Sequence, residues 1–359
     1  MSDEVAARIR AAIADHGPIT FAEFMEQALY GSGGFYERPP VGAEGHFVTS
    51  PHVHPVFADL LRFAFRDMRE ALGEPEPFPI VEVGAGDGTL ARQLLLGYEE
   101  ADHLAVDYTA IEISAGARER LSRLPIRVAA EVGALDPIDR VCLFANEVLD
   151  NLPFRRVRRH GAGVREIRVG LEDDRFVETL VPCEDELDAL APSLAEGDDA
   201  NVPTGALAFI DRLAASLRQG YVLLIDYRSG EASSAQEVHG YRDHRVLWNV
   251  LDEPGTTDIT AGVDFEAVVD RARDRGLTPL GMVSQRDALL ALGFDRWNQD
   301  AREAQIRLLA DRSLEAAKVW DSRNRAALLV DPTGLGRLSW LVLATRSLPK
   351  PRWLERAMS

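Results

Sequence analysis

One short stretch, residues 80–90, limits the folds open to this chain more than any other feature. It reads Ile-Val-Glu-Val-Gly-Ala-Gly-Asp-Gly-Thr-Leu, so apolar and β-branched residues precede three alternate glycines. Leucines then recur at helical spacing. We therefore predict a strand, a tight glycine turn, and a helix whose first N–H groups face any ligand above the turn.

The glycine spacing favours one class of ligand. A dinucleotide fingerprint requires G-x-G-x-x-G after the strand, whereas the third glycine here comes one residue early. Glu82 lies where a carboxylate can meet the ammonium group of S-adenosylmethionine (SAM), and Glu112, about 20 residues after the glycines, can accept hydrogen bonds from ribose hydroxyls. We predict a SAM site whose main chain is shaped by Gly84, Gly86 and Gly88. The alternative is an ordinary βα turn flanked by surface acids.

Composition excludes several classes of protein. Hydrophobic residues make up 46% of the 359 residues and charged residues 27%, as in globular proteins with a substantial core. The net charge of −18 disfavours binding to nucleic acid or to an anionic membrane surface. Cys142 and Cys183 are the only cysteines, which gives no support to a disulfide framework. Because the first residues lack the pattern of a secretion signal and no apolar run is long enough to span a bilayer, we expect a cytoplasmic protein.

Strand-like and helix-like segments alternate after the glycine turn. This alternation predicts a parallel sheet with helices on both faces, namely a Rossmann-like α/β core of seven strands whose last strand enters late. An alternating apolar and polar pattern between the two halves indicates a small antiparallel β-rich insertion. We predict an N-terminal helical and lid segment at residues 1–79, the first half of the core at 80–154 and the β-rich insertion at 155–203. The second half of the core with active-site loops follows at 204–285, then a helical insertion at 286–333, and the last strand with a tail at 334–359.

Polar residues cluster where two apolar strands end. Asn146, Glu147 and Asp150 follow the strand predicted at 140–145, and Asp226 ends the strand predicted at 221–226. Ligands of open parallel sheets bind beyond the carboxyl ends of the strands. We therefore expect these four residues to be catalytic and to face the acceptor. For Asp150 the alternative is the cap of a turn.

The N-terminal segment leaves two questions open. The glycine-aromatic loop at 30–36 is either a lid over the cofactor or a surface loop pinned by its aromatic rings. His46, His52 and His54 lie close in sequence, but no acid accompanies them at ligand spacing, so we predict no metal site.

Together these residues resemble the MidA family of SAM-dependent methyltransferases, over residues 18–345. The resemblance is carried by Phe21-Ala22-Glu23-Phe24-Met25, Ala28-Leu29-Tyr30, Gly34-Phe35-Tyr36, Phe47-Val48-Thr49-Ser50-Pro51, Glu82 to Leu90, Asn146-Glu147 with Asp150 and Leu152-Pro153, Asp226-Tyr227, Asp258-Ile259-Thr260 and Val263-Asp264-Phe265. The chain departs from the family at His46, where an acid is usual, at Asp87, where an arginine is common, and at Arg228, where a glycine is usual. His52 and His54 replace a polar pair that usually includes an acid.

The resemblance implies site residues beyond those found from the pattern. Mitochondrial members of the family methylate an arginine in a subunit of respiratory complex I. By resemblance we expect cofactor contacts from Thr49, Ser50 and Thr89, and acceptor contacts from His46, Phe47, Tyr227 and His244. His46 or Asp226 could serve as base for a small acceptor.

Three functions follow as hypotheses. The first is methylation of a protein or peptide side chain, arginine first. The second is O- or N-methylation of a small molecule. The third is a SAM-binding assembly factor with little turnover. A homodimer is left open.

Overall fold

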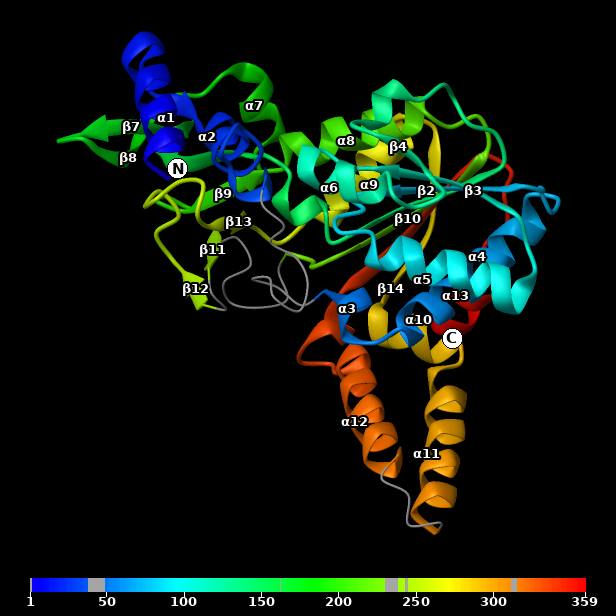
Figure 1. The fold of residues 1–359 in the computed structure, drawn as a ribbon. Coiled ribbons are helices and arrows are strands. Elements are labelled where there is room, and N and C mark those ends of the chain that lie inside the picture. The colour runs from blue at the N-terminus through cyan, green and yellow to red at the C-terminus, as the bar shows by residue number, and fades with distance from the viewer. Residues whose placement is uncertain (1, 38–48, 162, 230–237, 243–244, 311–314) are drawn as a thin grey trace.

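The computed structural model describes residues 2–37, 49–161, 163–229, 238–242, 245–310 and 315–359. His46, Phe47 and His244 lie outside these residues. The described chain forms a central sheet flanked by helices, a group of smaller sheets and helices beside it, and a projecting helical hairpin (Figure 1).

The central sheet has seven strands in the order β14-β15-β10-β5-β2-β3-β4. In chain order they are β2 Phe78–Val83, β3 Val106–Ile111, β4 Arg127–Ala129, β5 Val141–Asn146, β10 Gly220–Asp226, β14 Leu277–Ser284 and β15 Ser339–Thr345. The last strand, β15, inserts between β10 and β14 and is antiparallel to both. The other neighbouring strands that pair directly are parallel. The predicted seven-stranded Rossmann-like fold with a late final strand is confirmed.

Helices cover both faces of this sheet, which explains why its central strands are apolar along most of their length. β10 is buried at every position. One face packs against α4 Val56–Ala71, α5 Thr89–Gly97, α10 Gln285–Ala291 and α13 Arg352–Ala357, and the other against α8 Thr204–Ala215 and α9 Phe265–Asp274. α6 Ala115–Leu121 packs near the β3–β4 edge.

The N-terminal helices and the β-rich insertion pack together. β1 joins the insertion sheet by pairing Ile19 with Val169 of β7. A shared apolar core then links these elements to a separate three-stranded sheet. The elements of this layer are α1 Ser2–His16, β1 Ile19–Thr20, α2 Phe21–Leu29, β6 Arg155–His160, β7 Gly163–Glu172, β8 Arg175–Pro182, α7 Asp185–Leu190, β9 Asp199–Val202, β11 His239–Arg242, β12 Arg245–Leu247 and β13 Asp258–Thr260.

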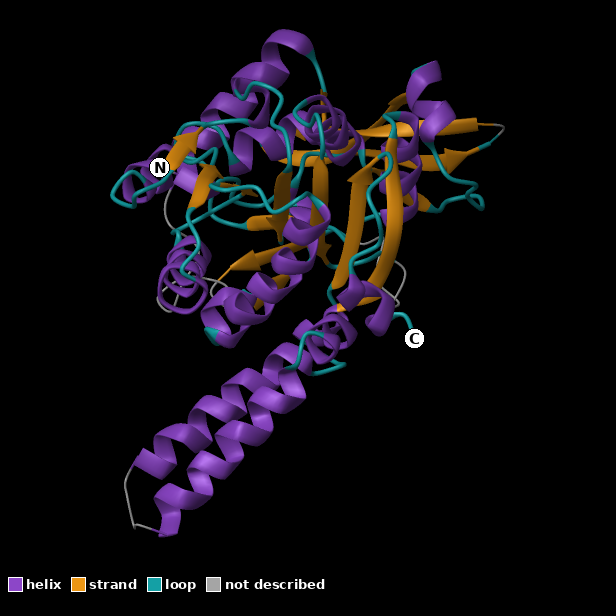
Figure 2. Ribbon diagram, turned by 90° about the vertical axis from the view of Figure 1, so that its right-hand side faces the viewer, coloured by secondary structure: helices purple, strands orange, loops and turns teal. Residues whose placement is uncertain are grey.

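A two-helix hairpin leaves the body after α10. It consists of α11 Phe294–Ala310 and α12 Glu315–Ala327, and Figure 2 shows it extending away from the sheet. The short helix α3 Ser50–Val53 lies at its base, where His54 Nε2 is 2.7 Å from Ser322 Oγ. Among the described helices, none has the length and apolar character required to cross a membrane.

The C-terminal helix is anchored by a buried tryptophan. Trp353 is fully buried, and its ring lies edge-on to Trp340 of β15 at 5.8 Å between centroids. Its backbone N–H donates to Asp67 Oδ2 of α4. The side chain therefore joins the last helix to the central sheet.

We predict that Trp353→Ala lowers the free energy of unfolding by about 3–5 kcal/mol, because it removes a large buried ring and leaves a cavity. Urea denaturation measures the change. The matched control is Arg352→Ala at the exposed neighbouring position, which removes only exposed ion pairs with Asp67 and Glu70 and should change stability by less than about 1 kcal/mol. Equal effects of the two substitutions would show that α13 contributes no core packing.

Candidate active site

The turn after β2 provides a backbone cradle. Gly84 and Gly86 have φ angles of +74° and +55°, a region that strongly favours glycine. A Cβ atom on Gly84 would lie 2.4 Å from Val148 Cγ2, whereas the space beside Gly86 is open within 4 Å. Both glycines line one large cavity, so the main chain itself can approach a ligand there.

Glu112 connects this turn to the end of β3. Its carboxylate accepts hydrogen bonds from Gly86 N–H and Ser114 N–H, both at 2.8 Å. Burial raises the pKa of Glu112, although these backbone donors oppose the rise. Glu112 lines the cavity beside Gly86, at the place where an acid was predicted to hold ribose hydroxyls.

Other predicted cofactor residues lie behind this surface. Glu82 is 4% exposed, and its Oε2 accepts a 2.6 Å hydrogen bond from the Tyr108 hydroxyl. Burial raises the pKa of Glu82 to about 8. Gly88, Thr89 and Ser50 are likewise not among the described residues that line the cavity, whereas Thr49 is.

Two of the departures from the family pattern, His52 and Asp87, contact each other. His52 Nε2 lies 3.2 Å from Asp87 Oδ2, and His52 Nδ1 lies 2.9 Å from Thr49 Oγ1. Asp87 also accepts hydrogen bonds from the backbone N–H and hydroxyl of Thr89. Burial opposes ionisation of Asp87, but these contacts outweigh it and lower its pKa to about 2. The pair fixes α3 against the glycine turn.

Asp226 holds the loop that follows β5. It is fully buried, and its Oδ2 accepts hydrogen bonds from the N–H groups of Val148, Leu149 and Asp150 at 3.0, 2.7 and 3.3 Å. Burial raises the pKa of Asp226 to about 6, and the backbone donors limit the rise. The structure places Asp226 below the loop and not among the described cavity-lining residues, unlike its neighbour Tyr227.

Glu147 and Asp150 are the acids of this loop that line the cavity. Glu147 has a φ of +54°, which is rare for a residue other than glycine and typical of functional sites. Its Oε1 accepts hydrogen bonds from Ser50 N–H at 3.3 Å and from Asn146 Nδ2 at 3.1 Å. Burial, with the nearby charge of Asp226, raises the pKa of Glu147 to about 7.

One carboxylate oxygen of Asp150 accepts no hydrogen bond from the described residues. Its Oδ1 is buried and has no hydrogen-bond partner among the described residues. Burial raises the pKa of Asp150 well above its ordinary value, and the charges of Asp226, Asp258 and Glu147 add to the effect. An incoming cationic donor would relieve both the missing hydrogen bond and the repulsion.

A further wall of the site was not predicted. Tyr30 and Tyr36 stack with ring centroids 5.4 Å apart, and both line the cavity. The Tyr36 hydroxyl donates to Asp258 Oδ1 at 2.9 Å, and the same oxygen accepts from Asn151 Nδ2 at 2.9 Å. The loop that the sequence left open as a lid or a surface loop thus contributes two aromatic rings to the cavity. In the sequence, the closely spaced aromatic residues from Tyr30 to Tyr36 were the signal from which this wall could have been predicted.

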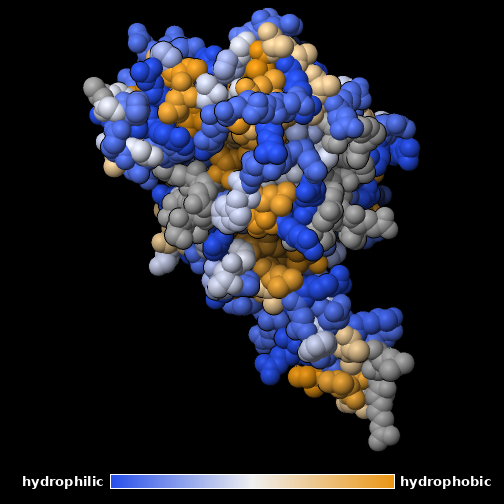
Figure 3. Space-filling view, turned by 90° about the vertical axis from the view of Figure 1, so that its left-hand side faces the viewer, coloured by the Kyte–Doolittle hydropathy of each residue, from blue (hydrophilic) through white to orange (hydrophobic). Residues whose placement is uncertain are grey.

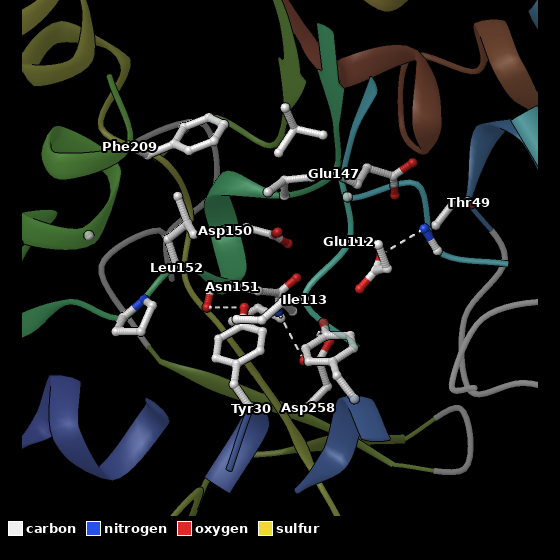
Figure 4. Close-up of a pocket in the computed structure, with 18 of the residues that line it drawn as sticks. Tyr30, Thr49, Glu112, Ile113, Glu147, Asp150, Asn151, Leu152, Phe209 and Asp258 are labelled. Atoms are coloured by element: carbon white, nitrogen blue, oxygen red, sulfur yellow. Dashed lines mark hydrogen bonds between the residues drawn. The ribbon is translucent and has the colours of Figure 1, made fainter. Parts of the chain in front are cut away.

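The cavity has a volume of about 1020 Å³, at the upper end of the range for small-molecule sites, which leaves space for a second ligand beside a nucleoside. Figure 4 shows Glu112, Glu147, Asp150 and Asp258 arranged around it. The open backbone at Gly86 and the carboxylate of Glu112 fit the ribose and methionine parts of SAM. Within the described residues, no cluster of three or more His, Cys, Asp or Glu side chains could hold a metal ion.

We predict that Glu112→Ala weakens SAM binding by roughly tenfold to a hundredfold, the loss expected when a charged hydrogen-bond acceptor is removed. Isothermal titration calorimetry measures the dissociation constant. Glu119→Ala, at an exposed position of α6, is the control and should leave binding unchanged. Unchanged affinity in the Glu112 variant would remove this carboxylate from the cofactor site.

Comparison with known proteins agrees with this geometry. Residues 61–283 match the model of the family described as "Putative S-adenosyl-L-methionine-dependent methyltransferase". The chain is 26% identical to the mitochondrial protein arginine methyltransferase NDUFAF7 of Bos taurus over 364 residues, covering 91% of this chain and 80% of the relative. The Homo sapiens protein of the same name is 26% identical over 356 residues, with coverages of 89% and 78%.

A solved structure shows the same similarity in three dimensions. A Burkholderia thailandensis protein, crystallised with S-adenosyl-homocysteine bound, superposes with a TM-score of 0.83 at 26% sequence identity, covering 97% of this chain and 93% of that one. S-adenosyl-homocysteine is the product that SAM leaves after methyl transfer, so the predicted cofactor is confirmed.

The expectation of a cytoplasmic protein is contradicted by these relatives, which are named as mitochondrial proteins. The expectation depended on composition and on the character of the first residues. Neither property identifies the compartment in which a folded domain works.

The fold, the glycine turn with Glu112 beside it, and the family match over most of the core agree with one another. The chain belongs to the family of S-adenosyl-L-methionine-dependent methyltransferases.

Proposed function

We propose that this SAM-dependent methyltransferase methylates a side chain of a protein or peptide, with arginine as the first candidate. The observation that carries the proposal is an uncompensated group of acids. Glu147, Asp150 and Asp258 line one cavity. Within the described chain none of the three forms an ion pair with a lysine or arginine, although four arginines also line the cavity. Such a group favours a cationic ligand.

A guanidinium group suits this site better than a point charge. It is planar, stays charged, and can donate paired hydrogen bonds to carboxylates. Asp150 Oδ1 offers a free acceptor, and the Tyr30–Tyr36 stack offers an aromatic wall on which a guanidinium can lie. The names of the NDUFAF7 relatives, protein arginine methyltransferases, support the same acceptor.

Each residue then has a defined task. When bound, SAM supplies an activated methyl group on a sulfonium. Glu147 and Asp150 hold the guanidinium so that one nitrogen faces the cofactor side of the cavity. Asp150 Oδ1 accepts the proton that the attacking nitrogen loses, since its raised pKa suits a general base. Asp226 is a positioning residue that acts through the loop.

We predict that Glu147→Gln and Asp150→Asn each lower methyl transfer to protein by at least about a hundredfold while SAM affinity is retained, because these groups bind and deprotonate the acceptor only. Radiolabelled SAM, incubated with fractionated protein and separately with a small-molecule extract, measures the transfer. Asp139→Asn, at an exposed loop, is the control and should keep full activity.

Two results would contradict the proposal. Label found only in the small-molecule extract would assign a small acceptor. Protein labelling at the full rate by both variants would show that neither carboxylate takes part.

We also predict that kcat/KM rises as the pH increases through about 7. Glu147 has a raised pKa of about 7, so it is neutral below this pH and cannot hold a cation, whereas above it the ionised form dominates. A pH profile of initial rates measures the rise. Glu147→Gln, which cannot titrate, should have a lower and flatter profile. The range from pH 6 to pH 8 extends roughly one pH unit on either side of the Glu147 pKa. A wild-type rate that falls over this range would contradict binding of the cation by an ionised Glu147.

A further inference from the structure

The α11–α12 hairpin projects from the body without a core of its own. Along its two described helices the buried residues are Phe294, Ala316 and Ala326. Helices in globular proteins are stabilised mainly by burying an apolar face, and a lone pair of helices cannot do this on both sides. The hairpin therefore presents an unpartnered surface.

Large apolar side chains lie exposed on both helices. Ile306, Leu309 and Trp320 are 56%, 58% and 57% exposed. Figure 3 shows apolar side chains gathered toward the free end of the hairpin. Exposed apolar groups concentrated on a projecting element are typical of an interaction surface.

We propose that this surface pairs with the same surface of a second copy of the chain, so that two hairpins form a four-helix bundle about a two-fold axis. In such an isologous contact each copy supplies the same residues, and Ile306, Leu309 and Trp320 of both copies become buried.

The distribution of charge favours a second copy as the occupant. Residues 294–327 carry seven basic and six acidic side chains, a net charge of +1, within a chain of net charge −18. Two hairpins can therefore meet with little repulsion, and their projection keeps the two acidic bodies apart (Figure 2). A strongly basic partner would be drawn to the acidic body and not to this nearly neutral hairpin.

The size of the surface sets the expected strength of the contact. α11 has 17 residues and is therefore roughly 25 Å long, and two adjacent helices are about 20 Å wide. Each face then offers about 500 Å², which gives a buried total of about 1,000 Å², at the lower limit for a specific interface. We expect dimerisation that depends on concentration in the micromolar range.

Light scattering coupled to size-exclusion chromatography tests the proposal on the full chain, between roughly 1 and 100 μM, the range expected for an interface of this size. The mass should rise toward about 79 kDa, twice the 39.6 kDa of one chain. Ile306→Ser with Leu309→Ser, and separately Trp320→Ala, should raise the dimer dissociation constant at least tenfold. Circular dichroism and SAM affinity should remain those of the wild type, because the changed side chains are exposed and far from the cofactor residues.

The control replaces exposed leucines elsewhere, Leu96→Ser and Leu190→Ser, which are 54% and 51% exposed, and should leave the dimer intact. A mass of one chain throughout the concentration range would overturn the proposal, as would a dimer that survives the hairpin substitutions. A monomeric wild type whose hairpin variants lose protein methylation alone would assign the surface to the acceptor protein instead.

Discussion

The site depends on the hydrogen bonds that the buried carboxylate of Asp226 accepts from the loop after β5. A charge with no exposure to water is unfavourable unless donors surround it. Asp226 receives backbone N–H groups from Val148, Leu149, Asp150 and Tyr227. These bonds compensate the lost hydration and fix the loop after β5 against β10. An apolar residue could fill the same space but could not hold three successive N–H groups.

The loop that Asp226 fixes joins the two halves of the cavity. Val148 packs over Gly84 on the cofactor side, which explains why a side chain at Gly84 would collide. On the acceptor side the Asp150 carbonyl accepts from Ala261 N–H, and Asn151 Nδ2 donates to Asp258. Displacement of this loop would therefore disturb the cofactor surface and the acid group together.

The parts of the site made by neighbouring residues could be predicted from the sequence. The glycine turn and Glu112 follow from spacing within one βα unit and from the rule that ligands bind at strand ends. Glu82 was harder to place, because it lies one residue inside the end of β2 and shares the face of Ile80, where it bonds to Tyr108. Counting alternate faces along that strand indicates this orientation.

Glu147 and Asp150 were predicted for the acceptor side from the end of a strand, but the wall formed by Tyr30, Tyr36 and Asp258 could not be predicted in the same way. Tyr36 and Asp258 are 222 residues apart in sequence, and only the packing of the N-terminal segment on the three-stranded sheet brings them together. Asp226 also ends an apolar strand at the active edge, as a catalytic acid would. Asp226 instead binds the N–H groups of a loop that lies 76 to 78 residues earlier in the chain. A local sequence pattern cannot predict a contact over such a separation.

The central claim is that one cavity holds SAM over the turn after β2 and a cationic side chain against the acids after β5. A crystal structure with S-adenosyl-homocysteine and an arginine-containing peptide tests it most directly. The account predicts guanidinium nitrogens within hydrogen-bond distance of Glu147 or Asp150, with the nucleoside beside Glu112. A guanidinium bound elsewhere while both carboxylates face only solvent, or a nucleoside bound away from the glycine turn, would contradict it.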